Sequence, residues 1–105
     1  MSIRNNATIS KKLNAGIKLF GDDWTLYIIT TLENDEMRYC EIERSLPKIN
    51  PATLANRLKK LEKEKLIQRR EETLNKLSVT YALTQKGRAA LPILIKLKQY
   101  ADRFL

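Results

Sequence analysis

The stretch between Asn50 and Lys65 has the sharpest helix start in the sequence. Asn50 can accept a hydrogen bond from a free backbone N–H as an N-cap, and Pro51 suits the first helical position, where no N–H donor is needed. Leucines then recur at helical spacing and form one apolar stripe, made of Leu54, Leu58 and Leu61. The pattern predicts an amphipathic helix with one buried face.

A polar face lies about 100° around the same helix. Its members share the helical spacing and are Thr53, Asn56, Arg57 and Lys60. Amide and guanidinium groups can read base edges, and ammonium and hydroxyl groups can bind phosphates. For a helix considered alone, a solvated face without a partner is the alternative, so the rest of the chain has to decide.

The composition limits the classes of function. The chain has 105 residues, enough for one domain (1–105), and its formal net charge of +8 favours a polyanionic partner. It has no histidine and one cysteine, which excludes histidine-based catalysis and multi-cysteine zinc sites within one chain. None of its three glycines lies in a phosphate-cradling pattern. We therefore expect no enzyme activity, no metal and no cofactor.

The hydropathy pattern gives an expected location. No apolar run approaches membrane-spanning length, and the first residues do not resemble a signal peptide. We expect a cytoplasmic protein without a membrane partner. Binding to an anionic membrane surface through the basic, apolar last helix is a minor alternative.

The first half of the chain is predicted to be helical. A helix over about residues 8–20 is capped by Thr8 or Ser10 and ended by Gly21, and a strongly apolar helix follows, capped by Asp22 or Asp23. We expect that second helix to be central to the core, with Trp24, Tyr27, Ile28 and Leu32 on one side.

After a turn at residues 33–36, Met37, Arg38 and Tyr39 form a short strand. A third helix, with Ile42 and Leu46 inward, must stop before Pro47. Joined closely to the Asn50 helix, it has the shape of a helix-turn-helix.

The period changes after Lys65. Residues 66–72 and 77–83 read as two strands joined by a polar, basic turn, which can lie beside a phosphate backbone or be an ordinary solvated hairpin. Thr84 caps a last helix over about residues 85–104, which Pro92 should bend or restart near residue 91. That helix is too apolar for one face of a single domain. We expect a second copy to cover it; the alternative is that it folds wholly into its own core.

The fold class is therefore mainly α (α+β): a winged helix-turn-helix with an added helix at each end. From about residue 13 onward the sequence resembles the HxlR-type transcriptional regulators, a family allied to the MarR-like proteins. The matching residues are Gly21, Trp24, Thr25, Leu26, Arg38, Tyr39, Glu41, Ile42, Leu46, Ile49, Leu54, Arg57, Leu58, Leu61, Glu62, Leu66, Ile67, Arg69, Arg70, Val79, Tyr81, Ala82, Leu83, Thr84, Gly87 and Pro92.

The resemblance implies a homodimer formed by the first and last helices, through Ile9, Leu13, Ile17, Leu94, Leu97, Tyr100, Ala101 and Phe104. It also implies a recognition helix, about residues 51–64, in the major groove of each half-site of a pseudo-palindromic operator in double-stranded DNA. A wing, about residues 73–77, would touch the flanking backbone. The expected DNA contacts are Arg38, Asn50, Thr53, Asn56, Arg57, Lys59, Lys60, Lys63, Asn75 and Lys76.

Two departures from the family pattern bear on structure and regulation. Lys65 stands where a small residue is expected, so a left-handed conformation there would cost about 1 kcal/mol relative to glycine. Several family members sense oxidants through a cysteine near the N-terminus, and this chain has only Cys40. We expect Cys40 to be a small buried apolar residue; a redox-sensitive thiol beside Arg38 and Arg44 is the alternative.

The favoured hypothesis is a sequence-specific, DNA-binding transcriptional regulator. Asn56 and Arg57 are its predicted base readers, because amide and guanidinium groups can pair bidentately with adenine and guanine. The phosphates would be held mostly by Arg38, Lys59, Lys60 and Lys63. The alternatives are a winged-helix adaptor that binds another protein and a nonspecific DNA-binding protein.

Overall fold

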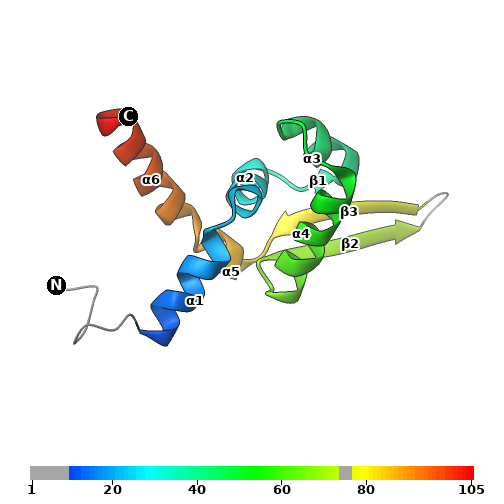
Figure 1. The fold of residues 1–105 in the computed structure, drawn as a ribbon. Coiled ribbons are helices and arrows are strands. Elements are labelled where there is room, and N and C mark those ends of the chain that lie inside the picture. The colour runs from blue at the N-terminus through cyan, green and yellow to red at the C-terminus, as the bar shows by residue number, and fades with distance from the viewer. Residues whose placement is uncertain (1–9, 74–76) are drawn as a thin grey trace.

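The computed structural model describes residues 10–73 and 77–105 (Figure 1). Thr8, Ile9, Asn75 and Lys76, to which the sequence assigned roles, lie outside these ranges. In chain order the elements are α1 (Lys11–Phe20), α2 (Asp23–Thr31), β1 (Met37–Arg38), α3 (Tyr39–Ser45), α4 (Pro51–Lys63), β2 (Ile67–Thr73), β3 (Leu77–Leu83), α5 (Gln85–Arg88) and α6 (Leu91–Phe104). The predicted winged helix-turn-helix with added terminal helices is confirmed.

Side-chain caps begin four of the helices, α1, α2, α4 and α5, the last of which is capped by Thr84. Of the two candidates before α2, the structure selects Asp22, whose carboxylate accepts from the backbone N–H of Trp24 at 2.9 Å. Ser10 caps α1, accepting from the N–H of Leu13. Asn50 caps α4 as predicted: its side-chain oxygen accepts from the N–H of Ala52 at 2.8 Å. These short polar side chains satisfy N–H groups that have no partner inside the helix.

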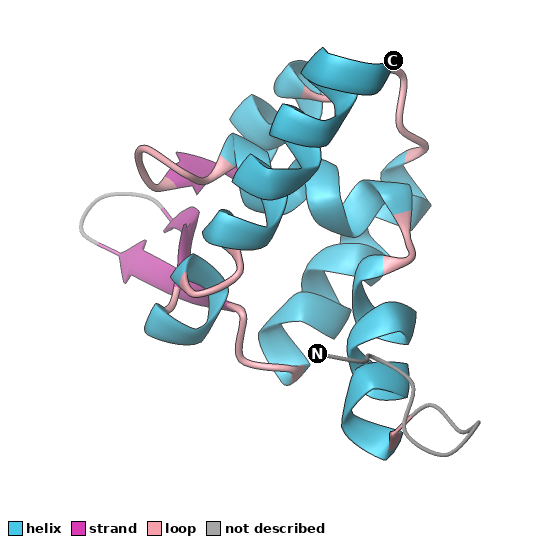
Figure 2. Cartoon of the chain, turned by 90° about the vertical axis from the view of Figure 1, so that its left-hand side faces the viewer, coloured by secondary structure: helices cyan, strands magenta, loops and turns pink. Residues whose placement is uncertain are grey.

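The three strands form one antiparallel sheet in the order β1-β3-β2. β3 pairs with β2 from Ile67 opposite Leu83 to Thr73 opposite Leu77, and β1 adds a two-residue edge. The predicted short strand was one residue too long, because Tyr39 begins α3. Figure 2 shows the strands gathered at one side of the molecule and helices making up the rest.

The core lies between α2, α3, α4 and the start of the wing. It contains the predicted leucine stripe of α4 together with Ile28, Ile29, Leu32, Ile42, Leu46, Ile49, Leu66, Ile67 and Leu83. The buried positions of α2 and its C-cap are 25, 28, 29 and 32, which share one face of a helix. Tyr27 falls off that face and is about half exposed, so the expectation that it is inward was wrong.

The last helix is two helices rather than one. α5 ends at Arg88, and α6 restarts at Leu91 with Pro92 in its first turn, where a missing N–H costs nothing. This matches the alternative of a new start near residue 91. α6 has no buried residue and projects from the body on the side away from the wing (Figure 1), so it is not folded wholly into its own core.

Within residues 10–73 and 77–105, no helix combines the length and apolar character needed to cross a membrane.

Candidate nucleic-acid interface

The most exposed stripe of α4 lies opposite the buried leucines. Successive side chains at i, i+4, i+7 and i+11 are all exposed, and we call them the outer stripe: Ala52, Asn56, Lys59 and Lys63. Asn56 offers an amide that can donate and accept, and the two lysines offer positive charge. Ala52 leaves the first turn unobstructed. This surface has the shape and chemistry of a helix that can enter a DNA groove.

The polar face predicted from spacing is turned toward one flank of this stripe. Asn56 and Lys60 are exposed, but Thr53 and Arg57 are half-buried. The Nε of Arg57 donates to Oδ2 of Asp22, with which it forms an ion pair. This pair engages Nε and leaves the two terminal nitrogens of the guanidinium as further donors, so base reading by Arg57 stays a prediction. Of the two predicted base readers, Asn56 is the more exposed.

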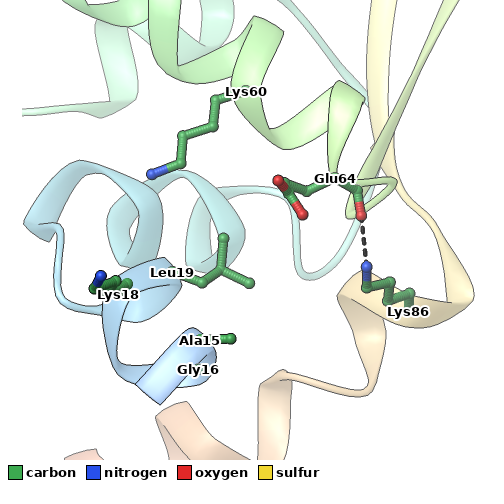
Figure 3. Close-up of a pocket in the computed structure, with 7 residues that line it drawn as sticks. All are labelled: Ala15, Gly16, Lys18, Leu19, Lys60, Glu64 and Lys86. Carbon is green, nitrogen blue, oxygen red and sulfur yellow. Dashed lines mark hydrogen bonds between the residues drawn. The ribbon is translucent and has the colours of Figure 1, made fainter. Parts of the chain in front are cut away.

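A shallow cavity of about 360 Å³ lies beside this flank, between α1, the end of α4 and α5 (Figure 3). Lys60 extends from α4 toward α1 at its rim, and the Nζ of Lys86 donates to the carbonyl oxygen of Glu64 at 2.7 Å. The lining consists of Ala15, Gly16, Lys18, Leu19, Lys60, Glu64 and Lys86. Three ammonium groups against one carboxylate make this flank of α4 positive, which favours a nearby phosphate backbone.

The other flank of α4 faces the sheet. A cavity of about 410 Å³ there is lined by Tyr39, Ala55, Lys59, Glu62, Arg69 and Tyr81. Arg69 forms an ion pair with Glu71, in which the guanidinium donates a hydrogen bond to the carboxylate. This hydrogen bond raises the pKa of the Arg69 guanidinium above its ordinary value. Arg69 was not among the predicted DNA contacts. It lies two residues into the first wing strand, directly after the recognition helix.

The remaining predicted DNA contacts fall at the two ends of the helix-turn-helix. Arg38 is exposed on β1, and its backbone N–H donates to Oε1 of Glu41 at 2.8 Å. Asn50 is exposed, with its side-chain oxygen committed to the cap and its amide N–H groups still available as donors. The wing-tip residues Asn75 and Lys76 lie outside the described ranges.

Cys40 is exposed, so the expectation of a buried apolar residue was wrong. Residues two apart lie roughly 200° apart around a helix, and Ile42 faces the core, so Cys40 must face outward. Exposure meets one requirement of a redox-sensitive thiol. The redox alternative stays a prediction.

Three of the predicted dimer residues of α6, Leu97, Tyr100 and Phe104, lie on an exposed apolar stripe together with Ile93, which was not predicted. At i, i+4, i+7 and i+11 lie Ile93, Leu97, Tyr100 and Phe104, exposed by 51, 51, 57 and 62%. The rings of Tyr100 and Phe104 contact each other, with centroids 5.1 Å apart. Leu94 and Ala101 are half-buried beside this stripe, and Ile17 is half exposed on α1. Apolar surface arranged in such a continuous stripe is typical of an interface.

A helix-turn-helix followed by a two-stranded wing, with a capped basic helix exposed between them, defines the winged-helix class of DNA-binding proteins. Within that class, the model of the HxlR-like helix-turn-helix family matches residues 19–105, and the chain belongs to this family. The resemblance stated from the sequence is confirmed.

Two curated relatives and two solved structures support the assignment. The chain is 32% identical over 97 residues to the HTH-type transcriptional regulator YodB of Bacillus subtilis strain 168, covering 92% of this chain and 87% of YodB. It is 29% identical over 101 residues to YvaP, an uncharacterized HTH-type transcriptional regulator of the same organism, covering 96% and 94%.

Reduced YodB superposes with a TM-score of 0.83 at 31% identity, covering 92% of this chain and 95% of YodB. A MarR-family regulator from Porphyromonas gingivalis W83 superposes with a TM-score of 0.87 at 27% identity, covering 97% and 100%. The protein is therefore a transcriptional regulator of the HxlR type with a DNA-binding helix-turn-helix fold, and it is not an enzyme.

Proposed function

We propose that the protein is a cytoplasmic homodimer that regulates transcription by binding a pseudo-palindromic DNA operator. In this proposal α4 lies in the major groove of each half-site. The observation that carries this proposal is the outer stripe. It presents an amide and two ammonium groups from a rigid, N-capped helix whose opposite face is buried in the core. Rigid presentation favours base reading, because each side chain then keeps its register along the groove.

The proposed contacts divide into readers and phosphate binders. Asn56 is the proposed base reader, since its amide can pair bidentately with adenine. Lys59, Lys60, Lys63 and Arg38 hold phosphates, and Asn50 and Thr53 contact the backbone near the helix start. Asn75 and Lys76 at the wing tip reach the flanking phosphates. Arg57 contributes through its ion pair rather than by reading a base.

The homodimer is proposed on the apolar surface of α6. A monomer would expose Ile93, Leu97, Tyr100 and Phe104 to water, at a cost of roughly 25 cal/mol for each Å² of apolar area left uncovered. A two-fold interface covers this stripe and the exposed residues of α1 with the same surface of a second copy. Such a dimer presents two recognition helices related by symmetry, which is what a palindromic operator requires.

In vitro selection of random duplexes by the purified protein tests the proposal. We expect a palindromic product with half-sites about one DNA turn apart, bound roughly 10³-fold or more above a scrambled duplex. Equal, steeply salt-dependent binding to both duplexes would instead mean a nonspecific DNA-binding protein. Capture of a protein partner that depends on residues 52–60, with no DNA binding, would mean an adaptor.

Two variants of the outer stripe separate reading from phosphate binding. Asn56→Ala should reduce discrimination at one base pair by roughly 1–3 kcal/mol and leave binding to scrambled DNA nearly unchanged. Lys63→Gln, two helical turns further along the same stripe, should weaken binding to all sequences alike and reduce the salt slope by about one. If both variants bind the operator and the scrambled duplex like the parent, α4 does not contact DNA.

A further inference from the structure

Asp22 contacts two different parts of the protein through one carboxylate. It stands between α1 and α2, where Oδ1 accepts from the backbone N–H of Trp24 at 2.9 Å and caps α2. Its other oxygen, Oδ2, accepts from Nε of Arg57, 35 residues later in the middle of α4. One side chain thus ties the joint between α1 and α2 to the recognition helix.

This ion pair is the most buried of those formed by the described residues. The side chain of Arg57 is 33% exposed and that of Asp22 20%, whereas both partners in the other three pairs are at least 36% exposed. Partial burial reduces screening by salt, and a charge-assisted hydrogen bond is directional. The pair therefore holds a defined geometry better than the surface pairs do.

The joint that carries Asp22 begins at the end of α1. Gly21 ends α1, and a Cβ atom added there would lie 2.7 Å from the carbonyl oxygen of Ile17, which is closer than such atoms approach. α1 is one of the two helices proposed to form the dimer. A contact from this joint to the middle of α4 can therefore relate the rotation of the recognition helix to the dimer.

We propose that Asp22 is a positioning residue for DNA recognition. By holding Arg57 it fixes the rotation of α4 against the α1–α2 joint, and so sets the spacing between the two half-sites that the dimer accepts. This inference rests on the proposed function, because half-site spacing has meaning only for a dimer bound to an operator. Arg57 acts through the pair and Asn56 does the reading.

The test uses substitutions that remove the pair and preserve its surroundings. Asp22→Asn keeps a side chain that caps a helix as well as aspartate does and removes the charge. Arg57→Met removes the charge and keeps a long apolar stem. Each variant and the double variant are titrated with the selected operator and with versions whose spacer is one or two base pairs longer or shorter.

The parent should prefer one spacing by about tenfold or more, and each single variant should reduce that preference to within about threefold. The double variant should be no worse than either single one, because both remove the same contact. Arg57→Lys, which keeps a cation, should retain part of the preference. Lys59→Gln is the control: it should weaken binding at every spacing and leave the ranking intact.

All titrations are run at a temperature below the unfolding transition of every variant. Three results would then overturn the inference. If Asp22→Asn keeps the spacing preference while Arg57→Met loses discrimination at a single base, Arg57 reads DNA directly. If both variants melt earlier but keep the preference, the pair serves stability alone. If the parent itself binds the operator and the scrambled duplex equally, the proposed function fails. That result is recognised from the parent alone, without any variant.

Discussion

The hydroxyl of Thr84 donates to the carbonyl oxygen of Lys65 at 2.6 Å, and this bond joins the end of the recognition helix to the end of the wing. The backbone N–H of Thr84 also donates to the carbonyl oxygen of Leu66 at 3.0 Å. The same hydroxyl accepts from the N–H of Gly87 at 3.1 Å and caps α5. The position of β3 and α5 relative to α4 is thus set at one junction.

Lys65 sits at this junction in the left-handed conformation, with φ of 64°. The N–H groups of Lys65 and Leu66 bond back to the carbonyls of Glu62 and Leu61, each at 2.9 Å, which forms a Schellman end to α4. Lys65→Gly should raise the free energy of unfolding by about 1 kcal/mol, because glycine has no Cβ penalty there. Urea unfolding at a fixed protein concentration measures it.

Lys63→Gly is the matched control, since Lys63 lies in the last turn of α4 with an exposed side chain. Glycine at that helical position should lower the free energy of unfolding by roughly 0.5–1 kcal/mol. If the two glycine variants shift stability in the same direction, the backbone conformation of Lys65 is not the cause.

Gly87 is required by close packing rather than by its backbone angles. A Cβ atom added there would lie 2.1 Å from the carbonyl oxygen of Leu66 and 3.2 Å from Cδ2 of Leu83. Gly87→Ala should therefore lower the free energy of unfolding by about 1–3 kcal/mol or more, because the obstructing atom is backbone. Gly16→Ala in α1 is the contrast, since nothing lies within 4 Å of its added Cβ. It should stabilise by up to about 1 kcal/mol.

Tyr39 links the starts of α3 and α4, because its hydroxyl donates to the carbonyl oxygen of Pro51 at 3.2 Å. Burial, followed by the nearby Glu43 and Tyr81, raises the pKa of its phenol above the ordinary 10.0. The folded protein therefore holds this proton more tightly than the unfolded chain does. The contribution to stability is complete below pH 10 and is lost as the pH rises through the folded-state pKa.

Tyr39→Phe removes both the donor and the titration. At pH 7 the variant should be less stable by roughly 0.5–1 kcal/mol, the low end for an exposed hydrogen bond. The difference from the parent should shrink as the pH rises above 10, because ionised Tyr39 can no longer donate. Urea unfolding series at pH 7, 9 and 11.5 would show it. A difference that stays constant across the series would contradict the titration.

Local signals predicted much of the fold. The Asn50 cap with Pro51, and the leucine stripe behind them, depend only on neighbours within two turns, and both were correct. The exposure of Cys40 could also have been predicted, because it lies two residues before the inward-facing Ile42 on the same helix.

The ion pair between Asp22 and Arg57 could not be predicted in the same way. Its partners are 35 residues apart, and each had a satisfactory local role, one as a cap and the other as a base reader. Only the packing of α2 against α4 brings them together. That packing turns one flank of α4 inward, so the exposed face of the recognition helix could not be placed from helical spacing alone.

Phe104 tests the proposed dimer, because it lies at the end of the exposed apolar stripe of α6 and is 62% exposed in the monomer. Phe104→Glu places a charge where a second copy would have to bury it, and burying an unpaired charge costs several kcal/mol. The variant should sediment as a monomer at concentrations where the parent is a dimer.

Gln99→Glu supplies the control for that substitution. It changes the charge of α6 by the same amount at an exposed position (i+6 from Ile93) about 120° away from the stripe. It should leave the sedimentation coefficient unchanged. The free energy of folding of the Phe104→Glu monomer should also lose its dependence on protein concentration, which the dimer must show. If Phe104→Glu and Gln99→Glu sediment alike, the stripe does not form the interface, and α1 would then have to supply it alone.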